Sequence, residues 1–429
     1  MSSRKESKLL TKERRKTMSC QVFQVKVDRS KLSNATLKHL NSVFNEAKWM
    51  YNYILSQPNI SMASTTIKTV PVKTPDGIEY RDFKYLSAQM KQSIKERIFN
   101  SLAGLSSLKK KGKRVGRLKF KSFINSIPLK QPSVTYTITD DKKHIKLQGL
   151  KHKLRVNGLE QIPEDSEIAN AMLVRKCSDF YFHITTYTHR QKHVPPKESI
   201  GIDFGCATQL TFSNGIKIEF QVPISDKLKR LDRRIDKKVN GKTGKNRGSK
   251  NRRKLQARRR KEYEHIANKK KDIRHKIVSA ITNNYKYVCF QDESIHTWHA
   301  GNHGKKIQNS GIGGIISDLK NKSETPVMIN KFFHSTQLCP KCGCLNKLKI
   351  SERTYKCGCG FVEDRDIKSA KCIEMEGIRV GKKDKIIPME HRNFKPEENL
   401  SSAFFDVLMK VNGVKVGKMS SMSQEALLE

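Results

Sequence analysis

Alternating apolar and polar side chains mark the first strands of the chain. Residues 19–28, SCQVFQVKVD, alternate in this way, and so do several short segments between residues 133 and 188 that turn residues separate. This pattern is typical of antiparallel strands that have one face in a core and the other in water. We therefore predict a small antiparallel barrel or sandwich made of residues 19–30 and 126–197, and of these we prefer the β-barrel.

Helical spacing interrupts that pattern. Over residues 37–54 and 90–105, apolar side chains recur every three or four positions, which places them on one face of a helix. Residues 31–125 are therefore expected to form a helical domain inserted into the barrel. The first 18 residues are basic and lack the apolar core of a signal peptide, so a disordered basic tail is expected there.

A second set of strands begins near residue 199. The segment 199–220, SIGIDFGCATQLTFSNGIKIEF, indicates three strands, with a tight turn at Asn214-Gly215 between the last two. Residues that follow have helical spacing, and further strands are expected at 285–291 and 327–334. The second half of the chain is therefore predicted to be an α/β domain.

The net charge of the chain indicates which class of partner it binds. Its 429 residues include 86 Lys and Arg but only 41 Asp and Glu, for a formal net charge of +45. Such an excess is typical of proteins that bind nucleic acid, and residues 241–261 contain no acidic residue at all. No apolar run approaches the roughly 20 residues that span a bilayer. We expect no membrane partner and a bacterial, cytoplasmic, nucleoid-associated protein.

Two cysteine pairs stand at the spacing of metal ligands. The pairs, CPKC and CGC, lie about fifteen residues apart, which is typical of Zn²⁺ held by four thiolates. The ligands are expected to be Cys339, Cys342, Cys357 and Cys359. Four thiolates leave no position for water, so the zinc is expected to be structural. Cys344 lies close enough in sequence to replace one ligand.

Three acidic residues lie at predicted strands or helix ends. Asp203 is inside a predicted strand, Glu293 ends the strand YVCFQDE, and Asp366 begins the helix DIKSAKCI. A buried carboxylate is unfavourable unless it is paired or binds metal. Three that meet at one point would bind two Mg²⁺ about 4 Å apart and hydrolyse a phosphodiester. Asp292 and Asp364 stay open as alternatives to their neighbours. The order strand–Asp–hairpin, strand–Glu, Asp–helix is that of a ribonuclease-H-like fold.

These motifs resemble the TnpB family, the RNA-guided nucleases of bacterial transposons, which are related to compact type V CRISPR effectors. The resemblance rests on GIDFGCATQLTFSNG, VCFQDESI and above all STQLCPKCG…CGCGFVEDRDIKSAKCI, and it covers roughly residues 19–400. It implies that the barrel is a wedge domain and that the inserted helices are a recognition domain. It further implies a RuvC nuclease domain at 198–336 and 363–378, a zinc-binding insert at 337–362 and a tail at 379–429.

The resemblance also implies a function. The chain would be a Mg²⁺-dependent, RNA-guided endonuclease that cuts double-stranded DNA beside a short motif, with Asp203, Glu293 and Asp366 as its catalytic residues. Its partners would be a guide RNA from the transposon end and the target DNA, with one protein per RNA. Two alternatives stay open: a compact type V CRISPR effector, and a nuclease-inactive zinc-ribbon regulator, against which the three intact acids argue.

Overall fold

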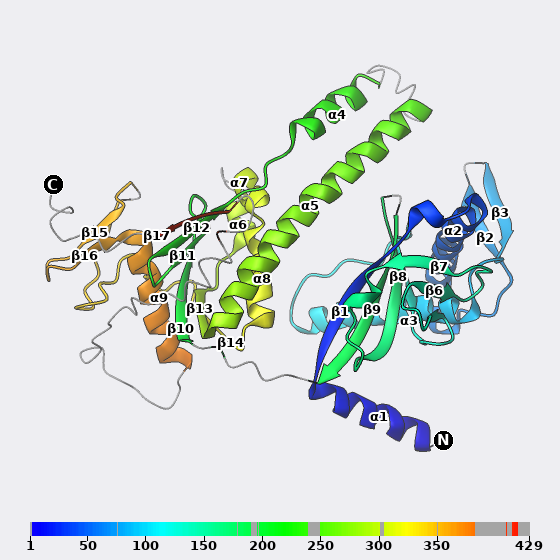
Figure 1. The fold of residues 1–429 in the computed structure, drawn as a ribbon, viewed down its shortest axis with the longest axis horizontal. Coiled ribbons are helices and arrows are strands. Elements are labelled where there is room, and N and C mark those ends of the chain that lie inside the picture. Colours follow the sequence, from blue (N-terminus) through cyan, green and yellow to red (C-terminus); the bar gives the residue numbers. More distant parts are fainter. Residues whose placement is uncertain are drawn as a thin grey trace. The chain divides into compact units, whose positions relative to one another are not determined.

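The structure is a computed structural model, and contacts divide the chain into two compact units, Met1–Gln191 and Lys192–Glu429 (Figure 1). It describes residues 2–74, 76–177, 179–189, 195, 197–238, 249–300, 304–349, 351–381, 409 and 414–418. Among the described helices, none combines the length and the apolar character that crossing a bilayer requires.

A seven-stranded antiparallel sheet organises the first unit, in the order β4-β8-β9-β1-β7-β6-β5. Its strands are β1 (Met18–Val27), β4 (Ser126–Leu129), β5 (Tyr136–Ile138), β6 (His144–Leu147), β7 (Leu154–Asn157), β8 (Glu167–Lys176) and β9 (Asp179–His189). Strand β1 pairs with both β7 and β9, although more than a hundred residues separate it from either. The strand predicted at 19–28 therefore joins the barrel-like sheet, as expected.

Two long helices share the core of that sheet. They are α2 (Asn34–Ser56) and α3 (Ala88–Lys110), and their apolar faces pack in one cluster with the buried side chains of the strands. The connection between them, which has no predicted strand, contains a hairpin of β2 (Thr69–Thr74) and β3 (Gly77–Asp82). Short 3-10 turns complete the unit at Arg29–Lys31, Ile60–Met62 and Leu159–Gln161.

The predicted disordered tail is wrong, because a helix, α1 (Ser2–Lys16), occupies this segment. Arg14 and Arg15 donate to the carboxylate of Glu167 at 2.8 and 2.7 Å, and the Arg15 guanidinium lies over the ring of Tyr187. These contacts tie the end of the helix to the sheet, which a reading of composition alone does not anticipate.

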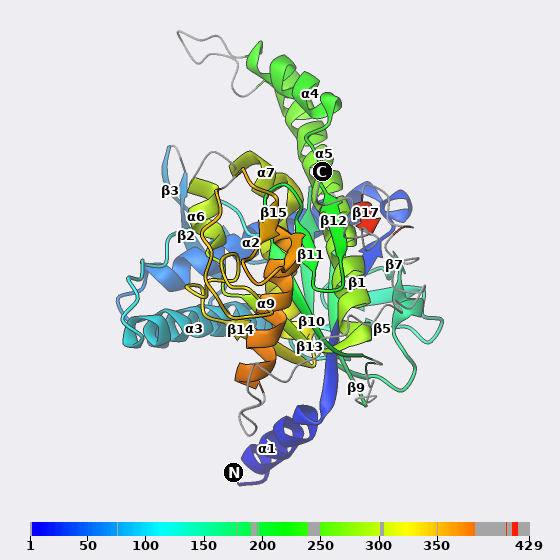
Figure 2. The ribbon, with the colours of Figure 1, turned by 90° about the vertical axis from the view of Figure 1, so that its left-hand side faces the viewer.

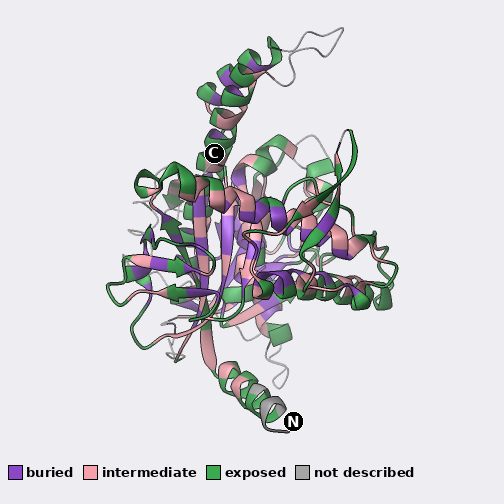
Figure 3. Cartoon of the chain, turned by 90° about the vertical axis from the view of Figure 1, so that its right-hand side faces the viewer, coloured by how far each residue is buried: buried purple, intermediate pink, exposed green. Residues whose placement is uncertain are grey.

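A six-stranded mixed sheet forms the second unit, in the order β14-β13-β10-β11-β12-β17. Its strands are β10 (Lys197–Phe204), β11 (Leu210–Phe212), β12 (Ile216–Phe220), β13 (Tyr285–Gln291), β14 (Thr325–Ile329) and β17 (Val414–Lys418). Strands β10, β13 and β14 run parallel, whereas β11, β12 and β17 are antiparallel to their neighbours. Most residues of β11 and β13 are buried. Figure 3, which faces the first unit, shows buried residues along the strands of that unit as well.

Helices cover both faces of this sheet (Figure 2). The helices of this unit are α4 (Asp226–Asp236), α5 (Lys250–Asn284), α6 (Ile295–Ala300), α7 (Gly304–Ser310), α8 (Ile312–Lys322) and α9 (Arg365–Gly381), and α5, α8 and α9 contact the strands. Val288 and Phe290 of β13 share a core with α5 and α8, whereas Cys289, between them, packs with Ile373 of α9. Because side chains alternate along a strand, α9 lies on the face opposite to α5 and α8.

Two strand predictions need correction in this unit. The strand expected at 327–334 is β14, which begins and ends earlier because it follows the register of β13. The segment 379–429, predicted to be a tail, contributes β17 to the free edge of β12. Most of the remaining tail lies outside the described residues.

Candidate active site and metal centre

The topology of the second unit brings the ends of two strands together. Asp203 is the last residue but one of β10, and Glu293 follows two residues after β13. Since β10 and β13 are adjacent and parallel, the segments that follow them leave the sheet at the same side, where the carboxyl ends of the strands lie. Asp366 lies in the first turn of α9 and reaches the same carboxyl ends of the strands.

A glycine allows α9 to approach the sheet this closely. A Cβ atom built on Gly201 would lie 2.1 Å from the backbone oxygen of Ala370, one turn into α9. Any larger residue at position 201 would push the helix away, and Asp366 with it. The glycine in the motif Gly-Ile-Asp-Phe-Gly therefore sets the distance between the strand that carries Asp203 and the helix that carries Asp366.

The three carboxylates line one hollow of about 630 Å³. Three cationic side chains, those of Lys306, Arg353 and Arg365, line it as well, together with Thr211, Gln291, Ser335 and Gln337. Asp366 pairs with two of these cations, since its oxygens lie 3.3 Å from Arg365 Nε and 3.8 Å from Arg353 Nη1. A wall with charges of both signs suits a ligand that combines cations with phosphate groups.

Burial, together with the charges of Asp366 and Glu293, raises the pKa of Asp203 to about 7, and Arg365 acts in the opposite direction. Burial also raises the pKa of Glu293. Like charges gathered in a partly dry hollow hold protons more tightly than carboxyl groups in water do. Cations that displace those protons would remove the repulsion, so this set of acids is suited to binding metal.

The structure separates each pair of neighbouring acids. Asp292 is exposed and forms an ion pair of 2.9 Å with Lys320, whereas Glu293 faces the hollow. Asp364 accepts hydrogen bonds from the backbone N–H groups of Asp366 and Ile367, which caps α9, and its second oxygen pairs with Lys217 at 2.8 Å. Neither Asp292 nor Asp364 lines the hollow. Each makes a structural contact instead, so Glu293 and Asp366 are the candidate site residues.

In the described part of the chain, four cysteines form one group of potential metal ligands whose ligand atoms all lie within 4.8 Å of one another. The three carboxylates do not form such a group. They therefore face one hollow but do not converge on one point.

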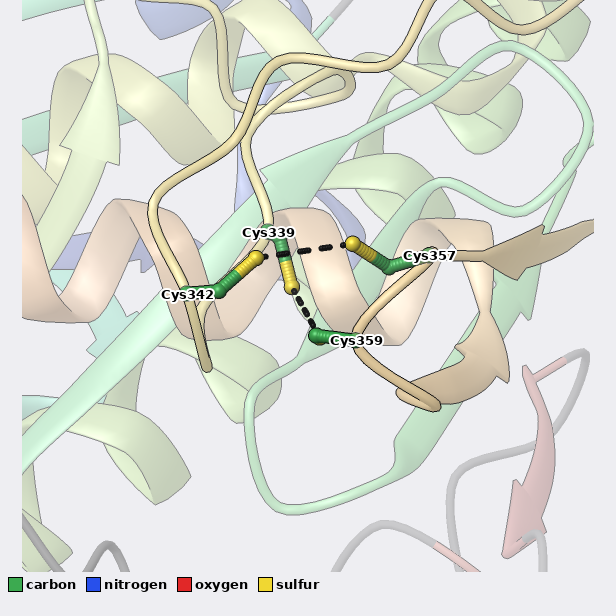
Figure 4. Close-up of side chains that lie close together, drawn as sticks. All are labelled: Cys339, Cys342, Cys357 and Cys359. Carbon is green, nitrogen blue, oxygen red and sulfur yellow. Dashed lines mark hydrogen bonds between the residues drawn. The ribbon is translucent and has the colours of Figure 1, made fainter.

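The cysteine set is the predicted one: Cys339, Cys342, Cys357 and Cys359 (Figure 4). The Sγ atoms of Cys339 and Cys359 are 3.7 Å apart, and those of Cys342 and Cys357 are 3.5 Å apart. Four sulfurs at about 2.3 Å from Zn²⁺ form a tetrahedron with edges of about 3.8 Å. The four side chains therefore fit a zinc ion.

Cys344 is not part of this cluster. It is exposed, and its backbone oxygen accepts a hydrogen bond of 2.8 Å from the N–H of Cys339. Its neighbour Gly343 adopts a φ of 73°, which lets the chain turn back beneath Cys339. Cys344 therefore supports the knuckle through its backbone oxygen, without joining the four clustered sulfurs.

A buried lysine connects the cysteine cluster to the carboxylates, and sequence analysis missed it. Lys368 lies two residues after Asp366 in α9 and is fully buried. Its Nζ donates to the backbone oxygens of Ser335 at 2.9 Å and Leu338 at 3.1 Å, and it lies 4.1 Å from the ring centre of Tyr355. The feature of the sequence that could have revealed Lys368 is its place among the apolar residues Ile367, Ala370 and Ile373, which form the inner face of the helix.

Comparison with known proteins agrees with this arrangement. Residues 182–292 match the OrfB_IS605 family, described as a probable transposase, and residues 317–373 match the Cas12f1-like TNB domain. A "Putative RNA-guided DNA endonuclease" of Streptomyces pristinaespiralis is 28% identical over 187 residues, which are 42% of this chain and 45% of the relative. A TnpB-like protein of Acanthamoeba polyphaga mimivirus is 27% identical over 215 residues, 44% of this chain and 39% of the relative.

These matches support a TnpB-family protein, in agreement with the family predicted from the motifs. The first matched segment contains Asp203 and ends one residue before Glu293, and the second contains the four cysteines and Asp366. The chain spans less than half the length of the curated relatives that it matches.

Two solved structures are also similar. The cryo-EM structure of a Cas12f1-sgRNA-target DNA complex matches with a TM-score of 0.37 and 14% identity, over 67% of this chain and 71% of that chain. A CRISPR-Cas12f ternary complex matches with a TM-score of 0.27 and 16% identity, over 80% and 85% of the two chains.

Proposed function

We propose that the chain is an RNA-guided DNA endonuclease in which Asp203, Glu293 and Asp366 form a two-metal site. The observation that carries the proposal is the hollow at the end of β10 and β13. Carboxylates from three separate segments line it, and the pKa of Asp203 is raised in part by the other two. The TnpB family membership and the name of the Streptomyces relative support the reaction class.

The three carboxylates would hold two Mg²⁺ ions, which supply an activated water and stabilise the leaving oxygen of a phosphodiester when bound. Asp203 must lose its proton before it can bind a cation, and its pKa of about 7 places this step close to neutral pH. Lys306 and Arg353, on the wall of the same hollow, would bind the phosphate oxygens of the strand to be cut.

The domain roles follow the same proposal. The barrel at 19–30 and 126–197 acts as a wedge domain, residues 31–125 as a recognition domain, and residues 198–336 with 363–378 as a RuvC nuclease domain. The insert at 337–362 holds the structural zinc. Guide RNA and double-stranded target DNA are the partners, and the guide reads the sequence while the protein reads a short adjacent motif and the backbone.

A matched pair of substitutions tests the site. Glu293→Gln removes a carboxylate that faces the hollow, and Asp292→Asn removes its exposed neighbour. We expect Glu293→Gln and Asp203→Ala to lower DNA cleavage by about 1,000-fold or more, since metal-bound charge contributes several kcal/mol to the transition state. Asp292→Asn should cut normally. Cleavage by Asp203→Ala at the wild-type rate would show that the site is assigned wrongly.

The RNA partner needs a separate experiment. RNA that copurifies with the full chain is sequenced after expression together with its flanking DNA. A defined RNA with a constant scaffold and a variable 3′ end would support an RNA-guided enzyme. Bulk tRNA and rRNA fragments would contradict it, whatever the outcome of the cleavage assay.

A further inference from the structure

Alternate side chains of β10 face helix α9, which lies against this strand (Figures 1 and 2). The Ser199 hydroxyl donates to the carboxylate of Glu374 at 2.5 Å, and a Cβ atom on Gly201 would meet the backbone oxygen of Ala370. Asp203 is two residues further along β10, so its side chain points to the same face. These contacts move towards the beginning of α9 as β10 proceeds. Asp203 therefore lies opposite the first turns of the helix.

Ser369 lies in this part of α9 and has no place in the mechanism so far. It follows Asp366 by three residues, so the two side chains share a face of the helix. Ser369 is fully buried and does not line the hollow of the carboxylates. It therefore touches neither solvent nor a ligand in the hollow, and it can act on the site only through a neighbouring side chain.

The hydroxyl of Ser369 lacks an ordinary partner. Its Oγ makes no hydrogen bond of standard geometry within the part of the chain that the structure describes. Serine hydroxyls inside helices often donate to the backbone oxygen one turn earlier, but this one does not. A buried hydroxyl without a partner is unfavourable, so such a group in a folded protein requires an explanation.

Asp203 is the acceptor beside this hydroxyl. Burial is the main cause that raises the pKa of Asp203, and hydrogen bonding from Ser369 acts in the opposite direction, although the contact falls short of standard geometry. The carboxylate of Asp366, one turn earlier in α9, is already paired with Arg353 and Arg365. The Ser369 hydroxyl is thus left to Asp203.

The two sides of Asp203 differ. The hollow lies on one side, and the buried Ser369 lies on the other. When a carboxylate binds a cation through one oxygen, a donor to its second oxygen fixes its orientation, and loss of such a donor weakens metal binding. A single hydroxyl behind Asp203 is enough for this purpose.

We propose that Ser369 is a positioning residue, whose hydroxyl donates to the Asp203 oxygen that points away from the hollow and so directs the other oxygen towards a bound cation. This inference rests on the proposed function, because it requires Asp203 to be a metal ligand. It assigns to Ser369 an effect on cation affinity rather than on the stability of the fold.

Two buried serines of the second unit provide a matched test. Ser369→Ala removes the hydroxyl beside Asp203, and Ser323→Ala removes another buried hydroxyl that has no partner in the described part of the chain. Ser323 ends α8 just before the amino end of β14, whereas the hollow is at the carboxyl ends of the strands. Asp203→Ala is the reference that lacks the proposed metal ligand.

Thermal unfolding of the full chain, freed of nucleic acid, is followed first without Mg²⁺ and then with increasing Mg²⁺ as the probe. Without Mg²⁺, both serine variants should unfold at the wild-type temperature or a few degrees higher, because each loses an unpartnered buried hydroxyl. The unfolding temperature of the wild type and of Ser323→Ala should then begin to rise at the same Mg²⁺ concentration. Ser369→Ala should require about 10–100-fold more Mg²⁺ for the same rise.

An equal response of Ser369→Ala and the wild type to Mg²⁺ would overturn the inference, and so would an equal weakening in Ser323→Ala. If Ser369→Ala unfolds well below Ser323→Ala without Mg²⁺, then packing explains its effect and the inference is wrong. Mg²⁺ that stabilises the wild type and Asp203→Ala alike would refute the proposed metal site itself, and this inference with it. The failure of the positioning role is therefore distinguishable from the failure of the proposed function.

Discussion

The substitution Asp203→Asn should stabilise the metal-free protein at alkaline pH, although it removes a residue of the proposed active site. Asn has nearly the shape of a protonated Asp but cannot ionise. Burial and the charges of Asp366 and Glu293 raise the pKa of Asp203, which means that its ionised form is unfavourable in the folded chain. The variant removes this unfavourable charge.

The size of the effect follows from the pKa. A rise from 3.8 in the unfolded chain to about 7 in the folded chain corresponds to up to about 4 kcal/mol, at about 1.4 kcal/mol for each pKa unit. Asp203 is only partly enclosed, so water screens some of the repulsion, and we expect about 2 to 4 kcal/mol. Since few substitutions stabilise a protein by this much, the effect is readily measured.

The pH dependence depends on which state holds the proton. Below about pH 3 Asp203 is neutral in the folded and the unfolded chain, so the two proteins should be equally stable. As the pH rises from there towards 7 the unfolded chain ionises first, and the wild-type protein loses stability relative to the variant. Above about pH 8 the difference should be constant, because Asp203 is then ionised in both states.

Urea unfolding in the presence of a chelator measures this difference. The chain has two tryptophans, and Trp298 packs against the core of the second unit, so a Trp49→Phe background makes the fluorescence report on that unit. Asp292→Asn is the control, since its exposed ion pair with Lys320 contributes little. If Asp203→Asn is no more stable than wild type at about pH 8, then burial and like charge do not disfavour the ionised form of Asp203, and this reasoning is refuted. Mg²⁺ should stabilise the wild-type protein and not the variant.

Three further substitutions, two of them with a control substitution, test the structure that supports the site. Cys357→Ser should abolish zinc binding and destabilise the second unit, whereas Cys344→Ser should keep the full zinc content, as measured by metal analysis and thermal unfolding. Lys368→Met should lower stability by about 1–3 kcal/mol and speed zinc release to a chelator, because two backbone oxygens lose their donor. Gly201→Ala should destabilise the protein by about 1–3 kcal/mol and slow DNA cleavage by displacing α9, whereas Gly104→Ala, with nothing near its Cβ, should be neutral or stabilising in thermal unfolding.

The periodicity of apolar residues was sufficient to predict most elements. Helices α2, α3 and α5 and strands β1, β10 and β13 lie where the spacing indicates, because each has one continuous face in a core. The prediction was wrong where order depends on distant partners. Helix α1 is held through Glu167, and β17 is held by pairing with β12. Neither contact is visible in a local window of sequence.

In the candidate site, too, local spacing predicts some residues and distant contacts decide the others. Spacing was enough to select the four cysteines, because zinc requires four sulfurs at short range and two knuckles supply them locally. The acids were identified by their positions at the ends of strands, but the choice between Glu293 and Asp292, or between Asp366 and Asp364, needed three dimensions. One member of each pair faces the hollow, and the other forms an ion pair or caps a helix.

By itself, the sequence determined the family, the elements that carry the chemistry and the zinc ligands, since these depend on residue type and on short spacing. Only the tertiary structure decided that Asp203, Glu293 and Asp366 share one hollow, that Gly201 lets α9 approach, and that Lys368 joins the zinc knuckle to the helix of Asp366. The physical reason is that the three acids lie far apart along the chain. Burial and their mutual repulsion, which together raise the pKa of Asp203, exist only after folding has brought them together.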